Sequence, residues 1–125
     1  MSTAAITGIY TVGVPVTDQA KALAFYTGTL GLATRVDAPM GNGSRWIEVA
    51  AGGAPTSVAL IPAKDAVPAG VETGIRLGTS SADEFHARLV AAGADVDEVL
   101  RWPGVPPMFA FRDQDGNGLE IVEQS

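Results

Sequence analysis

Apolar and polar residues alternate in several short segments of this 125-residue chain, and two of these segments lead into stretches with helical spacing. In the first, Val14 and Val16 alternate with other residues, and apolar residues then recur every three or four positions. A period of two indicates a strand with one buried face, and a period near 3.6 indicates an amphipathic helix. Asp18 suits the N-cap of that helix and Gly31 its C-terminal end. This part of the chain is therefore predicted to be a strand followed by a helix.

The same pattern occurs once more, about 60 residues further on. Ile75 and Leu77 alternate, Ser81 and Glu84 have the spacing of a capping box, and the helix is predicted to end at Gly93. Three further strands are expected after each helix, at 33–36, 45–50 and 56–62 in the first half and at 95–99, 108–112 and 119–123 in the second. The chain is thus predicted to be one domain of two modules, about 6–63 and 71–124, with a linker at about 64–70.

One helix in each module can cover only one face of a sheet, which leaves the opposite face open. A concave sheet face lined by alternating residues is a common design for a ligand cavity. The predicted fold is therefore α+β, with two βαβββ modules that form a curved mixed β-sheet around a cavity. A chain of this length can bury a core of its own without disulfides or metals.

Two segments also resemble a known family. These are VGVPVTDQAKALAFYTGTLGL near the start and FRDQDGNGLEIVE near the end. Together with the duplicated plan, they resemble the glyoxalase, bleomycin-resistance and extradiol-dioxygenase superfamily, also called vicinal oxygen chelate proteins, over essentially the whole chain. The superfamily contains isomerases, lyases, dioxygenases, epimerases, thiol transferases and drug-binding proteins, so the resemblance implies a fold and not one activity. It also implies a homodimer, because related proteins often complete or cover their pocket in that way.

In metal-dependent members of this superfamily, four strand positions surround a divalent metal ion. By resemblance, these positions correspond to Thr11, Ala59, Gly74 and Glu120. Only Glu120 has a side chain of a metal-ligand type. Since a catalytic divalent site normally needs about three protein ligands, we expect a pocket that uses no metal and no cofactor.

The segment 113–124 also matches the first half of a calcium-binding loop. Its twelfth position is Gln124, however, where such a loop needs a bidentate carboxylate. The two pairs Asp115-Gly116 and Asn117-Gly118 are typical turn signals, so we interpret the segment as a turn that leads into the last strand.

Two charged residues are candidates for chemistry. Glu120 is a carboxylate inside an apolar strand, and three roles stay open for it: a general base with a pKa raised by an apolar cavity, an electrostatic anchor for a ligand, or a vestige without a role. Arg76 lies on the same strand face as Gly74. It could pair with Glu120, hold an anionic ligand, or simply be exposed. A buried pair would lower the pKa of Glu120 and count against the general base.

Aromatic and methionine side chains in the later strands and their loops are candidates to line the cavity, although each could equally belong to the core. They are Met40, Trp46, Trp102, Met108, Phe109 and Phe111. The residues predicted to bind a ligand are Thr11, Trp46, Ala59, Gly74, Arg76, Trp102, Met108, Phe109 and Glu120. The single histidine, His86, is expected to be a solvated helix residue.

Composition excludes several classes of protein. The chain has no cysteine, which excludes disulfides and thiolate metal sites and fits a reducing cytoplasm. The net charge is −6 and the eight Lys and Arg residues are scattered singly, which argues against a nucleic-acid partner. No segment approaches the ~20 apolar residues of a membrane span, and no secretory signal is evident at the start. We therefore expect a cytoplasmic protein with a small-molecule partner.

Two hypotheses for function follow. The first is a metal-independent protein that binds a small organic ligand in its sheet cavity, for example to sequester a drug or a metabolite. The alternative is a metal-independent isomerase, lyase or hydrolase that uses Glu120 as general base. The missing metal ligands and the available aromatic residues favour the binding protein.

Overall fold

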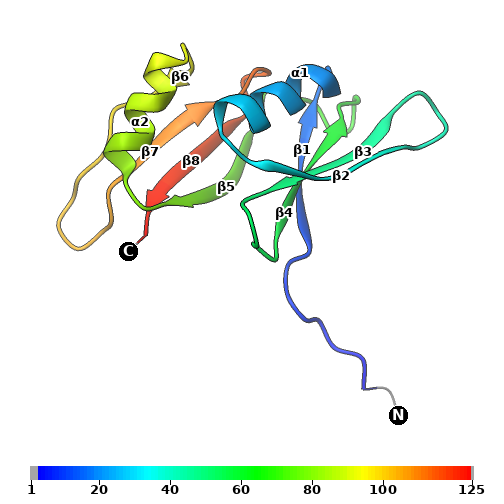
Figure 1. The fold of residues 1–125 in the computed structure, drawn as a ribbon, viewed down its shortest axis with the longest axis horizontal. Helices are drawn as coiled ribbons and strands as arrows, with labels where there is room; N and C mark the ends of the chain where they lie inside the picture. The colour runs from blue at the N-terminus through cyan, green and yellow to red at the C-terminus, as the bar shows by residue number, and fades with distance from the viewer. Residues whose placement is uncertain (1–2, 125) are drawn as a thin grey trace.

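The computed structural model describes residues 3–124 and contains the two predicted βαβββ modules (Figure 1). The first module consists of β1 (Thr11–Val16), α1 (Gln19–Ala24), the π-helix η1 (Phe25–Thr29), β2 (Ala33–Pro39), β3 (Arg45–Ala50) and β4 (Ser57–Pro62). The second consists of β5 (Glu72–Thr79), α2 (Ala82–Ala91), β6 (Asp95–Val96), β7 (Met108–Arg112) and β8 (Gly118–Glu123). Residues 3–10 form an extended arm ahead of β1 (Figure 1). The α+β class and the two-module plan are confirmed.

The strands form two four-stranded mixed sheets, with the orders β1-β4-β3-β2 and β5-β8-β7-β6. In each sheet the first strand of the module pairs in parallel with the last, and the remaining pairs are antiparallel. The strand expected over 95–99 is reduced to Asp95–Val96. Beyond Val96 the pairing with β7 is interrupted but not lost, because the Asp97 N–H donates to the Ala110 carbonyl (2.9 Å) and Leu100 forms an isolated bridge with Met108. The proline-rich connection then leads to β7.

Both predicted helix N-caps are present. Asp18 accepts a hydrogen bond from the Lys21 backbone N–H (3.1 Å), and Ser81 accepts one from Glu84 (3.2 Å). The second half of the expected capping box differs, because the Ser81 N–H donates to the Thr79 hydroxyl (3.4 Å). These side chains satisfy backbone donors that have no partner within the helix.

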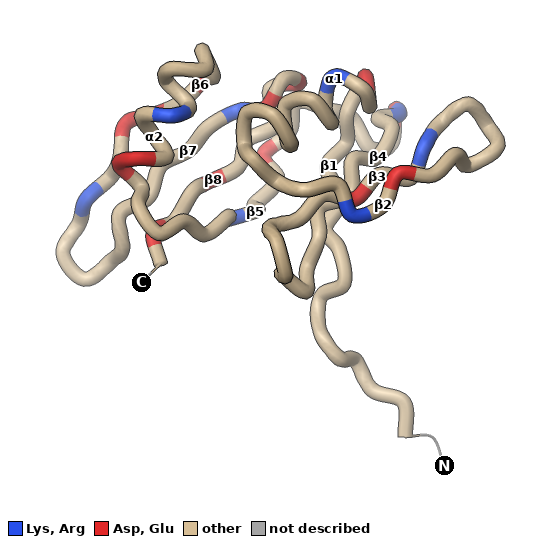
Figure 2. The backbone as a smooth tube through the Cα atoms, viewed as in Figure 1, with Lys and Arg blue, Asp and Glu red and all other residues tan. Residues whose placement is uncertain are grey.

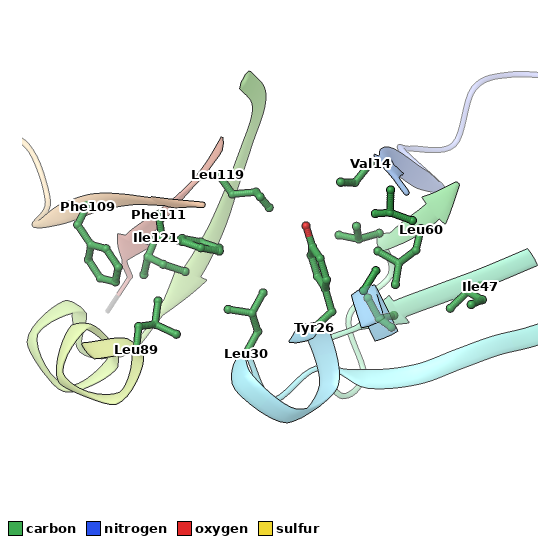
Figure 3. Packing of buried hydrophobic residues seen from close by; sticks show 14 of the residues in the cluster. Val14, Tyr26, Leu30, Ile47, Leu60, Leu89, Phe109, Phe111, Leu119 and Ile121 are labelled. Carbon is green, nitrogen blue, oxygen red and sulfur yellow. The ribbon is translucent and has the colours of Figure 1, made fainter. Parts of the chain in front are cut away.

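A single hydrophobic core connects the two modules. The helix α1 packs on β3 and β4, and α2 packs on β6, β7 and β8. Figure 3 shows Tyr26 and Leu30 between the core side chains of the first module and those of the second. Phe25 stacks on Phe111 across the same boundary, with ring centroids 6.4 Å apart. The modules therefore share one core and are not two independent units.

A buried polar cluster also joins the modules at the turn before β8. Asp113, only 6% exposed, accepts a hydrogen bond from the Tyr26 hydroxyl (2.7 Å) and one from the Asn117 amide (3.0 Å). Its other oxygen accepts the backbone N–H groups of Asp115 (2.9 Å) and Asn117 (3.0 Å). The Asn117 amide also donates to the Pro15 carbonyl in β1 (2.8 Å). The segment that resembles half of a calcium loop is thus a turn whose carboxylate is saturated by protein donors.

Candidate functional site

A cavity of about 580 Å³ lies between the two modules. The first module contributes apolar side chains such as Val12, Val49 and Val58, and the second contributes Ile75 and Leu77. Most of the remaining lining is glycine, alanine or hydroxyl-bearing residues. The volume is within the ~300–1,000 Å³ range that is typical of small-molecule sites. The cavity therefore offers an apolar environment of suitable size for an organic ligand.

Two of the predicted ligand-binding residues, Gly74 and Arg76, line this cavity. Gly74 has a φ of 73°, a conformation that favours glycine. Arg76 is the only charged residue in the lining among the residues that the structure describes. Its Nε lies 2.9 Å from Oε1 of Glu120, which is its register partner on β8. Of the three arrangements left open for Arg76, the structure has the pair with Glu120, and this pair is not buried.

Glu120 itself is not part of the cavity lining. Its side chain is 33% exposed and that of Arg76 is 64% exposed. The sequence-based expectation placed this carboxylate against an apolar cavity wall, and the structure corrects that expectation. The neighbour of Glu120 is a guanidinium, because β5 and β8 pair in parallel with Arg76 opposite Glu120.

Three other predicted residues lie in the first sheet, outside the cavity lining. Thr11 is in register with Ser57, and Ala59 is in register with Gly13. Trp46 is half-buried on β3. The four positions that correspond to a metal site are therefore divided between the two sheets. Within residues 3–124, no group of three or more His, Cys, Asp or Glu side chains is placed to hold a metal ion.

The aromatic candidates of the second module are not at the cavity. Phe109 is fully buried in the core on the helix side of its sheet, because it pairs with Ile121 and not with Glu120. Phe111 is on the same buried face. Trp102 is 65% exposed on the connection before β7, and Met108 is half-buried on β7. Phe109 therefore lies in the core and does not line the cavity.

His86 also differs from its predicted solvated state. It lies on α2, where its ring packs edge-on against Phe109 with centroids 5.0 Å apart. Its Nε2 is 2.9 Å from the Asp97 carbonyl oxygen. These two contacts tie α2 to β7 and to the segment after β6, so His86 has a structural position.

A second buried carboxylate, Glu48 on β3, was not predicted. Its side chain is fully buried and accepts hydrogen bonds from the Tyr10 hydroxyl (2.8 Å), the Trp46 indole N–H (2.7 Å) and the Ser57 hydroxyl (2.8 Å). Burial acts to raise the pKa of Glu48. The three donors, together with the positive charge of Arg35, outweigh burial and hold that pKa below its ordinary value. Glu48 is therefore held as an anion.

This cluster reaches the edge of the cavity through Ser57, which lines it and also lies 2.7 Å from the Thr11 hydroxyl. Tyr10 is 65% exposed at the end of the N-terminal arm. The sequence contains the signal that could have identified Glu48, because it stands between Ile47 and Val49 in an apolar strand, as Glu120 does between Leu119 and Ile121.

Residues 8–121 match the Glyoxalase/Bleomycin resistance protein/Dioxygenase superfamily. The chain belongs to this superfamily. The predicted resemblance is thereby confirmed, and with it the assignment of the two-module fold. No curated protein matches the chain.

Several solved structures of this superfamily are similar to the chain. An antibiotic binding protein, TnmS3 from Streptomyces sp. CB03234, is 35% identical, with a TM-score of 0.86 over 98% of this chain and 99% of that one. A glyoxalase/bleomycin resistance protein from the same organism is 36% identical, with a TM-score of 0.81 over 92% and 99%. A superfamily member from Sphaerobacter thermophilus DSM 20745 is 32% identical, with a TM-score of 0.87 over 95% and 98%.

The Lys and Arg positions of this superfamily member are spread singly over both modules and do not gather into one patch (Figure 2). Within residues 3–124, each helix is too short or too polar to span a bilayer.

Proposed function

We propose that this protein binds and sequesters a small organic molecule, such as an antibiotic or another secondary metabolite, in the cavity between its modules. The observation that carries the proposal is the cavity itself, with a volume of about 580 Å³, a mainly apolar lining and one charged residue. The similarity to an antibiotic binding protein, at 35% identity over almost the whole of both chains, supports the same function.

The apolar lining supplies affinity, because removing apolar surface from water contributes roughly 25 cal/mol per Å². The few polar groups, which include Ser57, Thr73 and Arg76, can fix the orientation of a ligand. We infer that binding needs no metal and no chemical step. Both candidate carboxylates already have partners, since Glu120 pairs with Arg76 and Glu48 accepts three hydrogen bonds. These contacts occupy oxygens through which a general base would take a proton from a ligand.

A thermal-shift screen of antibiotics and secondary metabolites tests this proposal. We expect at least one compound to raise the melting temperature, because a ligand at 100 times its Kd stabilises the folded state by about 2.7 kcal/mol. The shift is expected to persist after treatment with EDTA. The compound is also expected to be recovered chemically unchanged, as judged by mass spectrometry after prolonged incubation.

Two matched variants locate the binding. Ala54→Trp places a large side chain at the cavity lining and should abolish the shift, whereas Ala87→Trp, on the exposed surface of α2, should preserve it. A shift that survives Ala54→Trp would place the ligand elsewhere. Turnover of the compound would contradict the sequestration proposal and favour an enzyme.

A further inference from the structure

Arg76 gives the cavity a single positive charge among otherwise uncharged lining residues, as far as the described residues extend. Such a lining matches a ligand with an apolar body and one negative group. We propose that Arg76 is the specificity-determining residue of this cavity and that the cavity selects organic anions, such as carboxylates, sulfonates or phenolates. This inference rests on the proposed binding function and names its class of ligand.

The geometry of the guanidinium leaves it able to bind an anion while it is paired with Glu120. Its Nε lies 2.9 Å from Oε1 of Glu120, and its Nη1 makes only a long contact, 3.5 Å, with the Gly74 carbonyl. Within the part of the chain that the structure describes, its Nη2 donates no hydrogen bond. Arginine has five N–H donors in a planar fork, so the edge formed by its two Nη atoms can donate to two oxygens of one acid group.

A contact between Arg76 and an anion has to offset the negative charge of the protein as a whole. The whole chain has a net charge of −6, so its long-range field repels anions. An anion is therefore retained only if a contact inside the cavity compensates. Ile75 and Leu77, on either side of Arg76, also line the cavity and supply apolar surface to it.

Glu120 has an attenuating role in this arrangement. Its carboxylate pairs with the Nε of Arg76 and so partly neutralises the positive charge there. When an anion binds to the Nη edge, the same carboxylate repels it. Glu120 therefore moderates the affinity for anions and does not contact the ligand itself.

A pair of fluorescent probes tests the proposal. 1-Anilinonaphthalene-8-sulfonate is anionic, and N-phenyl-1-naphthylamine has the same aromatic body without the sulfonate. We expect the native protein to bind the sulfonate more tightly, with an affinity that weakens as salt is added. Arg76→Met should weaken sulfonate binding about tenfold, as expected for loss of a charge-assisted contact, while the neutral probe changes by less than about twofold.

Further variants separate the roles of the two residues. Glu120→Gln should strengthen sulfonate binding several-fold without affecting the neutral probe. Arg76→Lys keeps the charge and loses the planar fork, so its affinity for the sulfonate should lie between that of Arg76→Met and that of the native protein. Arg101→Met is the matched control, since Arg101 is also an exposed arginine paired with an acid, Asp83, and it does not line the cavity. It should leave both affinities unchanged.

The possible results distinguish this inference from the function on which it rests. If Arg76→Met weakens both probes equally, or weakens neither, anion selection by Arg76 is wrong while binding in the cavity stands. A loss of sulfonate affinity in Glu120→Gln would overturn the attenuating role. If neither probe binds saturably to the native protein, or if Ala54→Trp leaves both affinities intact, the cavity is not the binding site and both proposals fail.

Discussion

Replacing Asp113 with alanine is expected to lower the free energy of unfolding by about 3 kcal/mol or more, the loss typical of a broken buried network with a charged member. The carboxylate of Asp113 accepts four hydrogen bonds, from the Tyr26 hydroxyl, the Asn117 amide and two backbone N–H groups. Its removal leaves these donors without their partner in a region that excludes water. Urea denaturation followed by circular dichroism measures the change.

Asp97→Ala is the matched control for this prediction. Asp97 is likewise a carboxylate with a protein partner, Arg112 (2.8 Å), but its side chain is 54% exposed. Exposed ion pairs contribute about 0–1 kcal/mol, so the free energy of unfolding of this variant should remain close to that of the native protein. The loss of stability in Tyr26→Phe should lie between those of Asp113→Ala and Asp97→Ala, because this variant removes one donor and leaves Asp113 its other three. Equal losses for Asp113→Ala and Asp97→Ala would show that the buried cluster does not stabilise the connection between modules.

The sequence predicted best those elements whose ends are set by residues within the element or directly next to it. The bounds of β3 and β7 agree with the prediction because each is a short alternating segment between turn-forming residues. Asp18 and Ser81 begin their helices as expected, since an N-cap depends only on residues within one turn. The reduction of β6 to two residues depends on pairing with β7, which local pattern does not determine.

The candidate site was less predictable because it depends on register and on the placement of the modules. Alternation shows that Phe109 and Phe111 share a face, but only the pairing of Phe109 with Ile121 shows that this face is the core. The cavity lies between the modules, so its lining depends on how the shared core orients them. Arg76 and Glu120 were predicted as a possible pair, because both lie on strands with a clear period of two.

Glu48→Gln tests the second buried carboxylate, and its effect should depend on pH. At pH 7 we expect the variant to be less stable by about 2 kcal/mol, because a neutral amide accepts weaker hydrogen bonds than a carboxylate. The amide oxygen can still accept from Tyr10 and Trp46, and its NH₂ group can donate to the Ser57 hydroxyl. The variant should therefore fold, which allows its stability to be compared with that of the native protein across the pH range.

The direction of the pH effect follows from the lowered pKa of Glu48 in the folded state. A carboxyl with a lowered pKa stabilises the fold fully above its unfolded pKa, near 4.3, and this contribution disappears as the pH falls through the folded value. The stabilities of the native protein and the variant should thus converge between pH 5 and the acid range, as measured by urea denaturation at each pH. The pKa values of Asp37, Asp97 and Asp115 are also lowered, but these residues occur in both proteins, so their contribution cancels in the difference. Curves that run parallel down to low pH would mean that Glu48 is not held as an anion, because only the loss of its charge can close the gap.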